Sequence, residues 1–206
     1  MDIDVARPKR RREATVERLL DAALETFAEQ GFAAASVEDI CNRGGFTRGA
    51  FYSSFKTKDE LFAALMTREV DRDLARVAEQ LTGLSAEPDP LAAAVDRVLG
   101  AFRCDRTWTL VVTEYTLHAA RQPEAAEVLR RHEEQVGSRL AELVDRTAAE
   151  AGLPLVLPAA EVVGAVTALL NGFALLSLTA DGDLEPLRRT ALLSLVRGAV
   201  AGQKET

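Results

Sequence analysis

The apolar residues of this 206-residue chain recur every three or four positions almost from end to end. Between residues 15 and 30 they fall at Val16, Leu19, Leu20, Ala23, Leu24, Phe27 and Ala28. That spacing places them on one face of an α-helix over three turns. Long alternating runs of β-branched residues are absent, and Ala, Leu, Glu and Arg, which favour helix, dominate the composition. The pattern therefore predicts an all-α fold with about nine helices and no strand.

Capping and turn residues divide this pattern into separate helices. Gly31 ends the first one, because glycine readily adopts the left-handed conformation found at helix C-termini. Residues 36–39, Ser-Val-Glu-Asp, resemble a capping box in which aspartate replaces the usual glutamate. The helices are expected at about residues 15–30, 36–42, 47–52, 58–81, 91–103, 107–120, 123–151, 162–180 and 186–201.

The charge of the chain is unevenly distributed. Residues 7–12 hold five cations, so the rest of a chain with net charge −7 carries −12. An acidic body does not coat nucleic acid through its overall charge, but it can bind nucleic acid through one local surface. The apolar fraction of 48% and the charged fraction of 28% are those of a soluble globular protein.

No catalytic, metal or cofactor site is legible in the residue pattern. Cys41 and Cys104 are far apart with no CxxC pair, which excludes a disulfide framework and fits a reducing cytoplasm. His118 and His132 do not belong to an HExxH sequence, and the glycines of residues 44–49 do not form a P-loop. The alternative of an all-helical enzyme would need an acid, base or nucleophile set that is not visible, so we expect no enzyme, no metal and no cofactor.

Residues 162–180 carry no charge and approach the length of a transmembrane helix. Thr167 and Asn171 interrupt the stretch, and its flanks, Glu161 and Asp181, are acidic instead of basic. A helix that is apolar all round is also expected where it packs on both its own domain and a partner. We interpret the stretch as a core helix of a cytoplasmic protein that does not enter a membrane.

Residues 36–60 carry the sharpest local signal. Two short helices joined by a glycine turn and followed by a long amphipathic helix form a helix-turn-helix, whose second helix normally lies in the DNA major groove. The hidden core of this unit is expected to be Phe46, Phe51 and Phe55. The alternative is a helical hairpin of a bundle with a solvated polar face.

The residue types of the second helix suit DNA. Arg48 can bind guanine O6 and N7 with two hydrogen bonds. Gly49 and Ala50 let the backbone approach closely, and the Ala50 methyl group can contact a thymine methyl group. Hydroxyl groups and cations for phosphate oxygens are supplied by Tyr52, Ser53, Ser54, Lys56 and Lys58.

Residues 15–65 resemble the DNA-binding domain of the TetR family of transcriptional regulators. The matching text is AALETFAEQGFAAASVEDICNRGGFTRGAFYSSFKTKDELFAAL. Its helix stop, cap, glycine turn, tyrosine, phenylalanine and Lys-Asp-Glu-Leu-Phe fall in the family's order. The resemblance implies a basic flexible arm at residues 1–12, a three-helix DNA-binding domain at 13–57, and a ligand-binding and dimerisation bundle at 58–206.

The resemblance also assigns roles by position. It implies that Thr47, Arg48, Ala50 and Ser54 contact bases or nearby backbone, that Tyr52 and Lys58 grip phosphates, and that Ser36 and Arg43 flank the groove. Cys41 stands where alanine is usual, and the Ser53-Ser54 pair replaces a commoner aromatic or histidine pair, which leaves the base preference open. The arm of residues 7–12 could follow the DNA backbone or minor groove, or remain a solvated tail.

By the same resemblance the chain is expected to be a repressor. It would bind a palindromic double-stranded DNA operator as a dimer and leave it when a small hydrophobic effector enters the bundle. A DNA-binding protein without a ligand is the alternative. The expected pocket residues are Phe102, Trp108, Tyr115, His118, Asn171 and Phe173. From the sequence alone, core packing is the default interpretation of Trp108, Tyr115 and His118.

A homodimer through the last two helices is expected from their composition. One chain has too little remaining apolar surface to cover both the charge-free helix at 162–180 and the amphipathic helix at 186–201. The small residues Gly164, Ala168 and Gly172 would let two copies approach closely.

Overall fold

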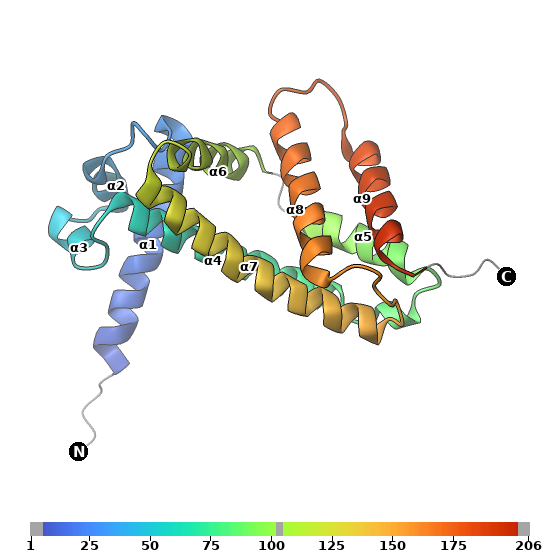
Figure 1. Ribbon diagram of the computed structural model, residues 1–206. Helices are drawn as coiled ribbons and strands as arrows, with labels where there is room; N and C mark the ends of the chain where they lie inside the picture. The colour runs from blue at the N-terminus through green and yellow to red at the C-terminus, as the bar shows by residue number, and fades with distance from the viewer. Residues whose placement is uncertain (1–5, 102–104, 202–206) are drawn as a thin grey trace, which may run out of the picture. The chain divides into compact units, whose positions relative to one another are not determined.

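The computed structural model describes residues 6–101 and 105–201, except for the side chains of residues 6–11, and is shown in Figure 1. Over these residues the chain is helical and forms no named strand, as the apolar spacing predicted. The α-helices are α1 (Ala6–Gln30), α2 (Val37–Gly44), α3 (Arg48–Tyr52), α4 (Lys58–Gln80), α5 (Pro90–Ala101), α6 (Arg106–Ala119), α7 (Pro123–Glu150), α8 (Ala159–Leu176) and α9 (Glu185–Ala199). A 3₁₀ turn, η1 (Leu84–Ala86), precedes α5.

Two helix boundaries differ by four residues or more from the sequence-based expectation. Helix α1 begins at Ala6, so residues 6–12 are helical and do not form part of a flexible arm. Arginine and lysine are good helix formers, and Pro8 lies in the first turn, where a missing N–H group costs no intrahelical hydrogen bond. Helix α8 ends at Leu176, four residues before the expected end, and a turn follows it.

The helices group into two compact units. The first contains the described residues up to Arg68 together with 110–129, and the second contains the described residues of 69–109 and those from Arg130 onward. Helices α4, α6 and α7 therefore each supply residues to both units. The division differs from the expected boundary at residue 57, because residues of α4 and α6 complete the core of the first unit.

Aromatic rings form the centre of the first unit. The Tyr115 ring of α6 stacks on the Phe62 ring of α4, with ring centroids 3.8 Å apart and an angle of 15° between the planes. The Phe32 ring packs edge-on against both, at centroid distances of 5.4 Å from Phe62 and 4.9 Å from Tyr115. Phe27 lies 5.1 Å from Phe32, and all four side chains are almost completely buried. Such contacts contribute beyond the area that they bury.

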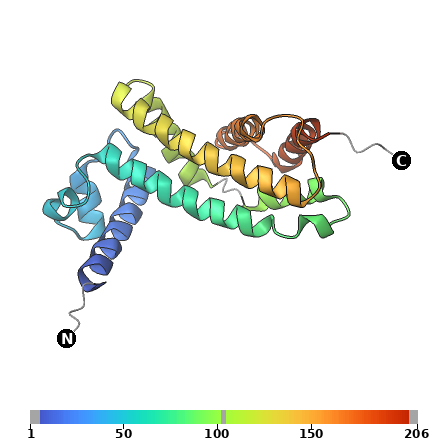
Figure 2. The ribbon, with the colours of Figure 1, turned by 60° about the horizontal axis from the view of Figure 1, so that its bottom comes forward.

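In the second unit α5, α8 and α9 pack around a shared aliphatic core. Helices α8 and α9 lie side by side in Figures 1 and 2. Val95 and Leu99 of α5 meet Leu170 of α8 and Leu192 of α9 in the core. At its edge both oxygens of the Asp96 carboxylate accept hydrogen bonds from Arg189, at 2.5 and 2.9 Å, which lowers the pKa of Asp96.

Helix α8 is the one described helix with the length and hydropathy of a membrane span. A single helix of this kind is weak evidence for a membrane, since core helices of soluble proteins share these properties. Its buried side, which includes Val162, Val163 and Leu170, packs within the second unit.

A buried histidine gives the second unit a pH-dependent stability. Only 8% of His132 on α7 is exposed, and its Nε2 atom has no hydrogen-bond partner among the described residues. Burial lowers the pKa of His132 from its ordinary value of 6.5, and the nearby negative charge of Asp71 opposes this only in part. Between the folded-state pKa and 6.5 the unfolded chain therefore binds more protons than the folded chain, so stability falls as the pH drops through this range.

We expect the melting temperature to fall between pH 7.5 and pH 5, and to fall less in a His132→Leu variant, which cannot titrate at this position. Thermal unfolding followed by circular dichroism across this pH range measures both curves. A His132→Leu curve that keeps the full pH dependence of the unmodified chain would show that another group is responsible.

Candidate nucleic-acid interface

Helix α2 begins and ends with interactions that are local in sequence. The Asp39 N–H group donates to Ser36 Oγ at 3.1 Å, and the Ser36 N–H group donates to Asp39 Oδ2 at 3.0 Å. These reciprocal bonds confirm the capping box. The hydrogen bonds that the Ser36 hydroxyl and N–H groups donate to the Asp39 carboxylate lower the pKa of Asp39. Gly45 follows the helix with φ of 69°, a left-handed conformation that favours glycine. The start of α2 and the tight turn after it are thus stabilised by interactions within residues 36–45.

Helix α3 is short and depends on its neighbours. Thr47 caps it, since its Oγ1 atom accepts a hydrogen bond from the Ala50 N–H group at 3.2 Å. The thiol of Cys41, which is buried, donates to the Thr47 carbonyl at 3.7 Å and links α2 to the start of α3. Phe51 and Phe55 are buried beneath the helix, with ring centroids 5.9 Å apart.

Phe46 departs from the expected hidden core. It is half-buried, and the Arg18 guanidinium of α1 lies 4.7 Å from its ring centroid. The Arg18 side chain also donates to the Gly44 carbonyl at 3.0 Å. The turn between α2 and α3 is therefore held against α1 by a cation that covers the ring.

The outer face of α3 presents exposed polar groups whose contacts within the protein are local. The Arg48 side chain is 63% exposed, and its nearest carboxylate, Glu38, is 3.9 Å away, which makes a weak ion pair. Tyr52 is 51% exposed. A Cβ atom added at Gly49 would meet only Thr47 Oγ1, at 3.7 Å, so the protein's own packing leaves room for a side chain there. Arg48 and Tyr52 interact with one another through their side chains, and both stay exposed beside Gly49.

Of the other predicted DNA contacts, Arg43 and Ser53 are engaged within the protein. Arg43 forms ion pairs with Glu25, at 3.4 Å, and with Glu29, both on α1. Ser53 Oγ donates to the Ala50 carbonyl at 2.7 Å, and Ser54 is half-buried. The Lys56 side chain is exposed, and Ala50 is half-buried on the same helical turn as Gly49.

Lys58, which the resemblance placed on a DNA phosphate, is engaged within the protein. Its Nζ atom donates to the carbonyl oxygens of Phe32, at 2.5 Å, and Ala35, at 2.8 Å, and lies 4.4 Å from the Phe32 ring centroid. Burial lowers the pKa of Lys58, although Asp59 opposes the shift. The amine therefore fastens the loop before α2 and does not face outward toward a phosphate. The sequence does not reveal this, because the acceptors lie 23 and 26 residues away.

The predicted pocket residues are divided between the two units. Tyr115 and His118 belong to the first unit, where Tyr115 is buried among rings and His118 Nε2 lies 3.3 Å from Asp59 Oδ1. Burial also raises the pKa of Tyr115. Trp108 and Phe173 are half-buried and Asn171 is exposed, all in the second unit. Phe102 lies outside the described residues.

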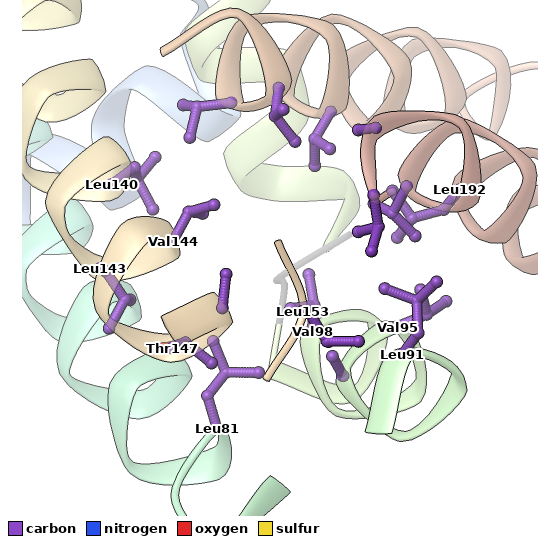
Figure 3. Close-up of a pocket in the computed structure, with 18 of the residues that line it drawn as sticks. Leu81, Leu91, Val95, Val98, Leu140, Leu143, Val144, Thr147, Leu153 and Leu192 are labelled. Carbon is purple, nitrogen blue, oxygen red and sulfur yellow. The ribbon is translucent and has the colours of Figure 1, made fainter. Parts of the chain in front are cut away.

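A cavity of about 210 Å³ lies in the second unit between α4, α5, α7, α8 and α9. Figure 3 shows aliphatic side chains converging on it, among them Leu81, Val98, Leu140, Val144 and Leu192. None of the five described residues that were predicted as pocket residues lines it. The prediction favoured aromatic and polar-tipped residues, whereas Leu and Val at helical spacing are indistinguishable in sequence from ordinary core.

Two family models match the chain. "Bacterial regulatory proteins, tetR family" matches residues 19–65, and "BetI-type transcriptional repressor, C-terminal" matches residues 88–203. The first match contains α2, α3 and the start of α4, and the second contains most of the cavity lining.

The chain is also similar to individual transcriptional regulators. The HTH-type transcriptional regulator UidR of Escherichia coli (strain K12) is 30% identical over 116 residues, which cover 56% of this chain and 57% of UidR. An uncharacterized HTH-type transcriptional regulator of Mycobacterium tuberculosis (strain ATCC 25618 / H37Rv) is 36% identical over 87 residues, 42% of this chain and 45% of that protein. The chain thus matches about half the length of these curated relatives. A solved transcriptional regulator from Rhodococcus sp. Rha1 is 25% identical, with a TM-score of 0.64 over 91% of this chain and 99% of that one.

Lys56 and Lys58 form a matched pair for a test of these placements. Lys58→Ala removes the donor from two carbonyl groups, so we expect it to lower the free energy of unfolding by about 1–2 kcal/mol. Lys56→Ala is expected to leave stability unchanged and, if Lys56 meets a phosphate, to reduce the salt dependence of DNA binding by about one counterion. Urea unfolding and DNA titrations at several salt concentrations measure the two effects. The placement of Lys58 would be wrong if its variant kept full stability.

Proposed function

The chain belongs to the TetR family of bacterial transcriptional regulators, and from this premise we propose that it is a ligand-responsive repressor. It acts in the cytoplasm as a homodimer on a palindromic DNA operator, and a small apolar effector in the cavity of the second unit releases the DNA. It has no catalytic role in this proposal. The observation that carries the proposal is the exposed polar face of α3, at the N-terminus of which Arg48 stands.

Base reading by α3 follows from its composition and exposure. Arg48 has a guanidinium fork that matches guanine O6 and N7, and its ion pair with Glu38 is weak enough to be exchanged for a base. Thr47 and Gly49 are exposed beside it. Tyr52, at the C-terminal end of α3, is also exposed and offers its hydroxyl group to a DNA phosphate. Ser36 and Arg43 contribute indirectly, because their interactions fix α2 and the turn that orient α3.

Dimerisation through α8 and α9 is supported by an uncovered apolar face. Along α8 the exposed positions Gly164, Ala168, Gly172 and Leu175 follow one another at helical spacing. Nothing in the described chain lies within 4 Å of a Cβ atom placed at either glycine. On α9 the Leu187 side chain is 60% exposed. A second copy packed against this face would remove it from water, and small residues would let the two α8 helices approach closely.

Coupling between cavity and DNA is proposed to pass through α4. Val77 in its last turn and Leu81 directly after it line the cavity, and its first residues carry Lys58 and Phe62, which hold the DNA-binding unit together. A ligand shifts the protein between two arrangements only if it binds them with different affinity. A coupling of about 1–3 kcal/mol would weaken DNA binding roughly 5- to 150-fold. The cavity favours this function over that of a DNA-binding regulator without a ligand.

An Arg48→Ala variant tests the base-reading role. We expect its affinity for the selected operator to fall by roughly 5- to 150-fold, with relaxed preference at one base position in each half-site, because one bidentate contact is lost. Selection of bound sequences from random DNA, followed by fluorescence titration, measures both effects. The control is Arg146→Ala, an exposed arginine of the second unit, which should bind normally. Unchanged affinity and selectivity in the Arg48 variant would contradict the assignment.

An Ala168→Glu variant tests the dimer. A carboxylate on the proposed contact face would have to be buried against the partner without a counter-charge, so the variant is expected to be monomeric at micromolar concentration. Light scattering should then give 22.3 kDa for the variant and about twice that mass for the unmodified chain. Ala126→Glu, at an exposed position of α7, is the matched control and should remain dimeric. A monomeric unmodified chain, or a dimeric Ala168→Glu variant, would contradict the proposal.

A further inference from the structure

We propose that the effector occupies the cavity of the second unit with an uncharged hydrocarbon group of about eight or nine carbon atoms, and that charged ligands are excluded there. This inference rests on the proposed ligand response and adds the chemical class of the ligand. It is carried by the lining of the cavity and by its volume.

The cavity presents only carbon atoms to a ligand. Its lining residues are leucines, valines and alanines, together with Thr147 and Thr167, neither of which exposes a polar atom to the interior. The side chains labelled in Figure 3 come from α5, α7 and α9, from Leu81 directly after α4, and from the segment around Leu153. Among the described residues, no charged side chain, amide, histidine or aromatic ring belongs to the lining.

This lining excludes charged and strongly polar groups on energetic grounds. A charge buried without a partner loses its hydration and gains nothing in return, and an unpaired hydroxyl or amide group loses a smaller amount. Quaternary ammonium ions are bound in proteins by aromatic faces, which the described lining does not offer. A sugar or a choline-like cation would therefore leave polar groups unsatisfied, whereas a hydrocarbon group would lose nothing on entry.

The volume gives the size of the group. An aliphatic cavity of about 150 Å³ stays dry and binds benzene, which has six carbon atoms. The present cavity has a volume of about 210 Å³. With the same volume for each carbon atom, it holds roughly eight or nine carbon atoms. Branched side chains surround the space on all sides that Figure 3 shows, so any polar group of the ligand must remain at the opening.

The first experiment separates charge from shape. Calorimetric titration of the full-length protein compares choline with 3,3-dimethylbutan-1-ol, in which a carbon atom replaces the charged nitrogen at the same shape. We expect the neutral compound to bind at least 100-fold more tightly than choline. Equal binding of the two compounds, or tighter binding of choline, would overturn the inference.

The second experiment measures the size of the site. In a series of 1-alkanols from butanol to dodecanol, affinity should rise about fourfold with each added CH₂ group until the cavity is full, at eight or nine carbons, and then level off. Val144→Phe should move this limit to shorter alkanols, and Leu140→Ala should move it to longer ones by two or three carbons. Arg146→Phe adds the same ring at an exposed position of α7 that does not line the cavity, and should leave the limit unchanged.

The two variants act in opposite directions, so a folding defect in one does not remove the test, and melting temperatures identify such a defect. A chain-length limit that neither folded variant moves would overturn the assignment of the cavity. DNA titrations without and with octanol test separately whether ligand binding releases DNA, as the proposed function requires. Alkanol binding with the expected limit but without DNA release would support the ligand class and contradict the ligand response. If the protein bound no alkanol and a charged compound released the DNA, the ligand response would be supported and the ligand class contradicted.

Discussion

The loop between Gly31 and Ala35 is held from two sides by charged side chains, and the start of α2 depends on it. On one side the Lys58 amine donates to the carbonyl groups of Phe32 and Ala35. On the other, the Glu114 carboxylate accepts a hydrogen bond from the Phe32 N–H group at 2.7 Å. Gly31 makes this approach possible: its φ is 83°, and a Cβ atom there would lie 2.6 Å from Glu114 Oε2. Because the loop leads directly into the Ser36 cap, fixing its peptide groups fixes where α2 starts.

The two charged groups come from helices that also reach the second unit. Lys58 begins α4, and Glu114 lies in α6 next to Tyr115, whose ring stacks on Phe62 of α4. The loop before α2 is thus tied to both helices by hydrogen bonds, while the aromatic rings pack them together. A displacement of either helix would have to break a charge-assisted hydrogen bond or move the loop. The segment of residues 31–35 is therefore a direct link from α4 and α6 to the start of α2.

The two units divide polar and apolar recognition between them. The outer face of α3 offers an exposed cation, hydroxyl groups and backbone, which suits a charged and hydrated partner such as DNA. The cavity of the second unit offers aliphatic carbon and no polar atom, which suits a ligand that gains from leaving water. The α3 face therefore suits electrostatic and hydrogen-bonding interactions, and the cavity suits hydrophobic interactions.

Local interactions account for what the sequence determined. Helical periodicity, the Ser36 capping box, the Thr47 cap and the glycine after α2 each depend on residues within about four positions, so they could be identified before any tertiary contact was known. The exposure of Arg48 and Tyr52 follows from the same pattern, since the apolar positions of α3 face inward. These features were sufficient to predict the all-α fold and the helix-turn-helix.

Only the tertiary structure decided which partners the remaining side chains meet. The carbonyl groups bound by Lys58 lie 23 and 26 residues away, and the N–H group bound by Glu114 lies 82 residues away. A lysine in a DNA-binding segment and a tyrosine in a bundle helix have the residue types of ligand contacts, yet the folded chain uses Lys58 to hold a loop and Tyr115 to complete a core. The cavity was equally hidden, because its volume is the space left between five helices. Sequence periodicity determines which face of each helix is apolar, but the distance between those faces is set by how the helices pack.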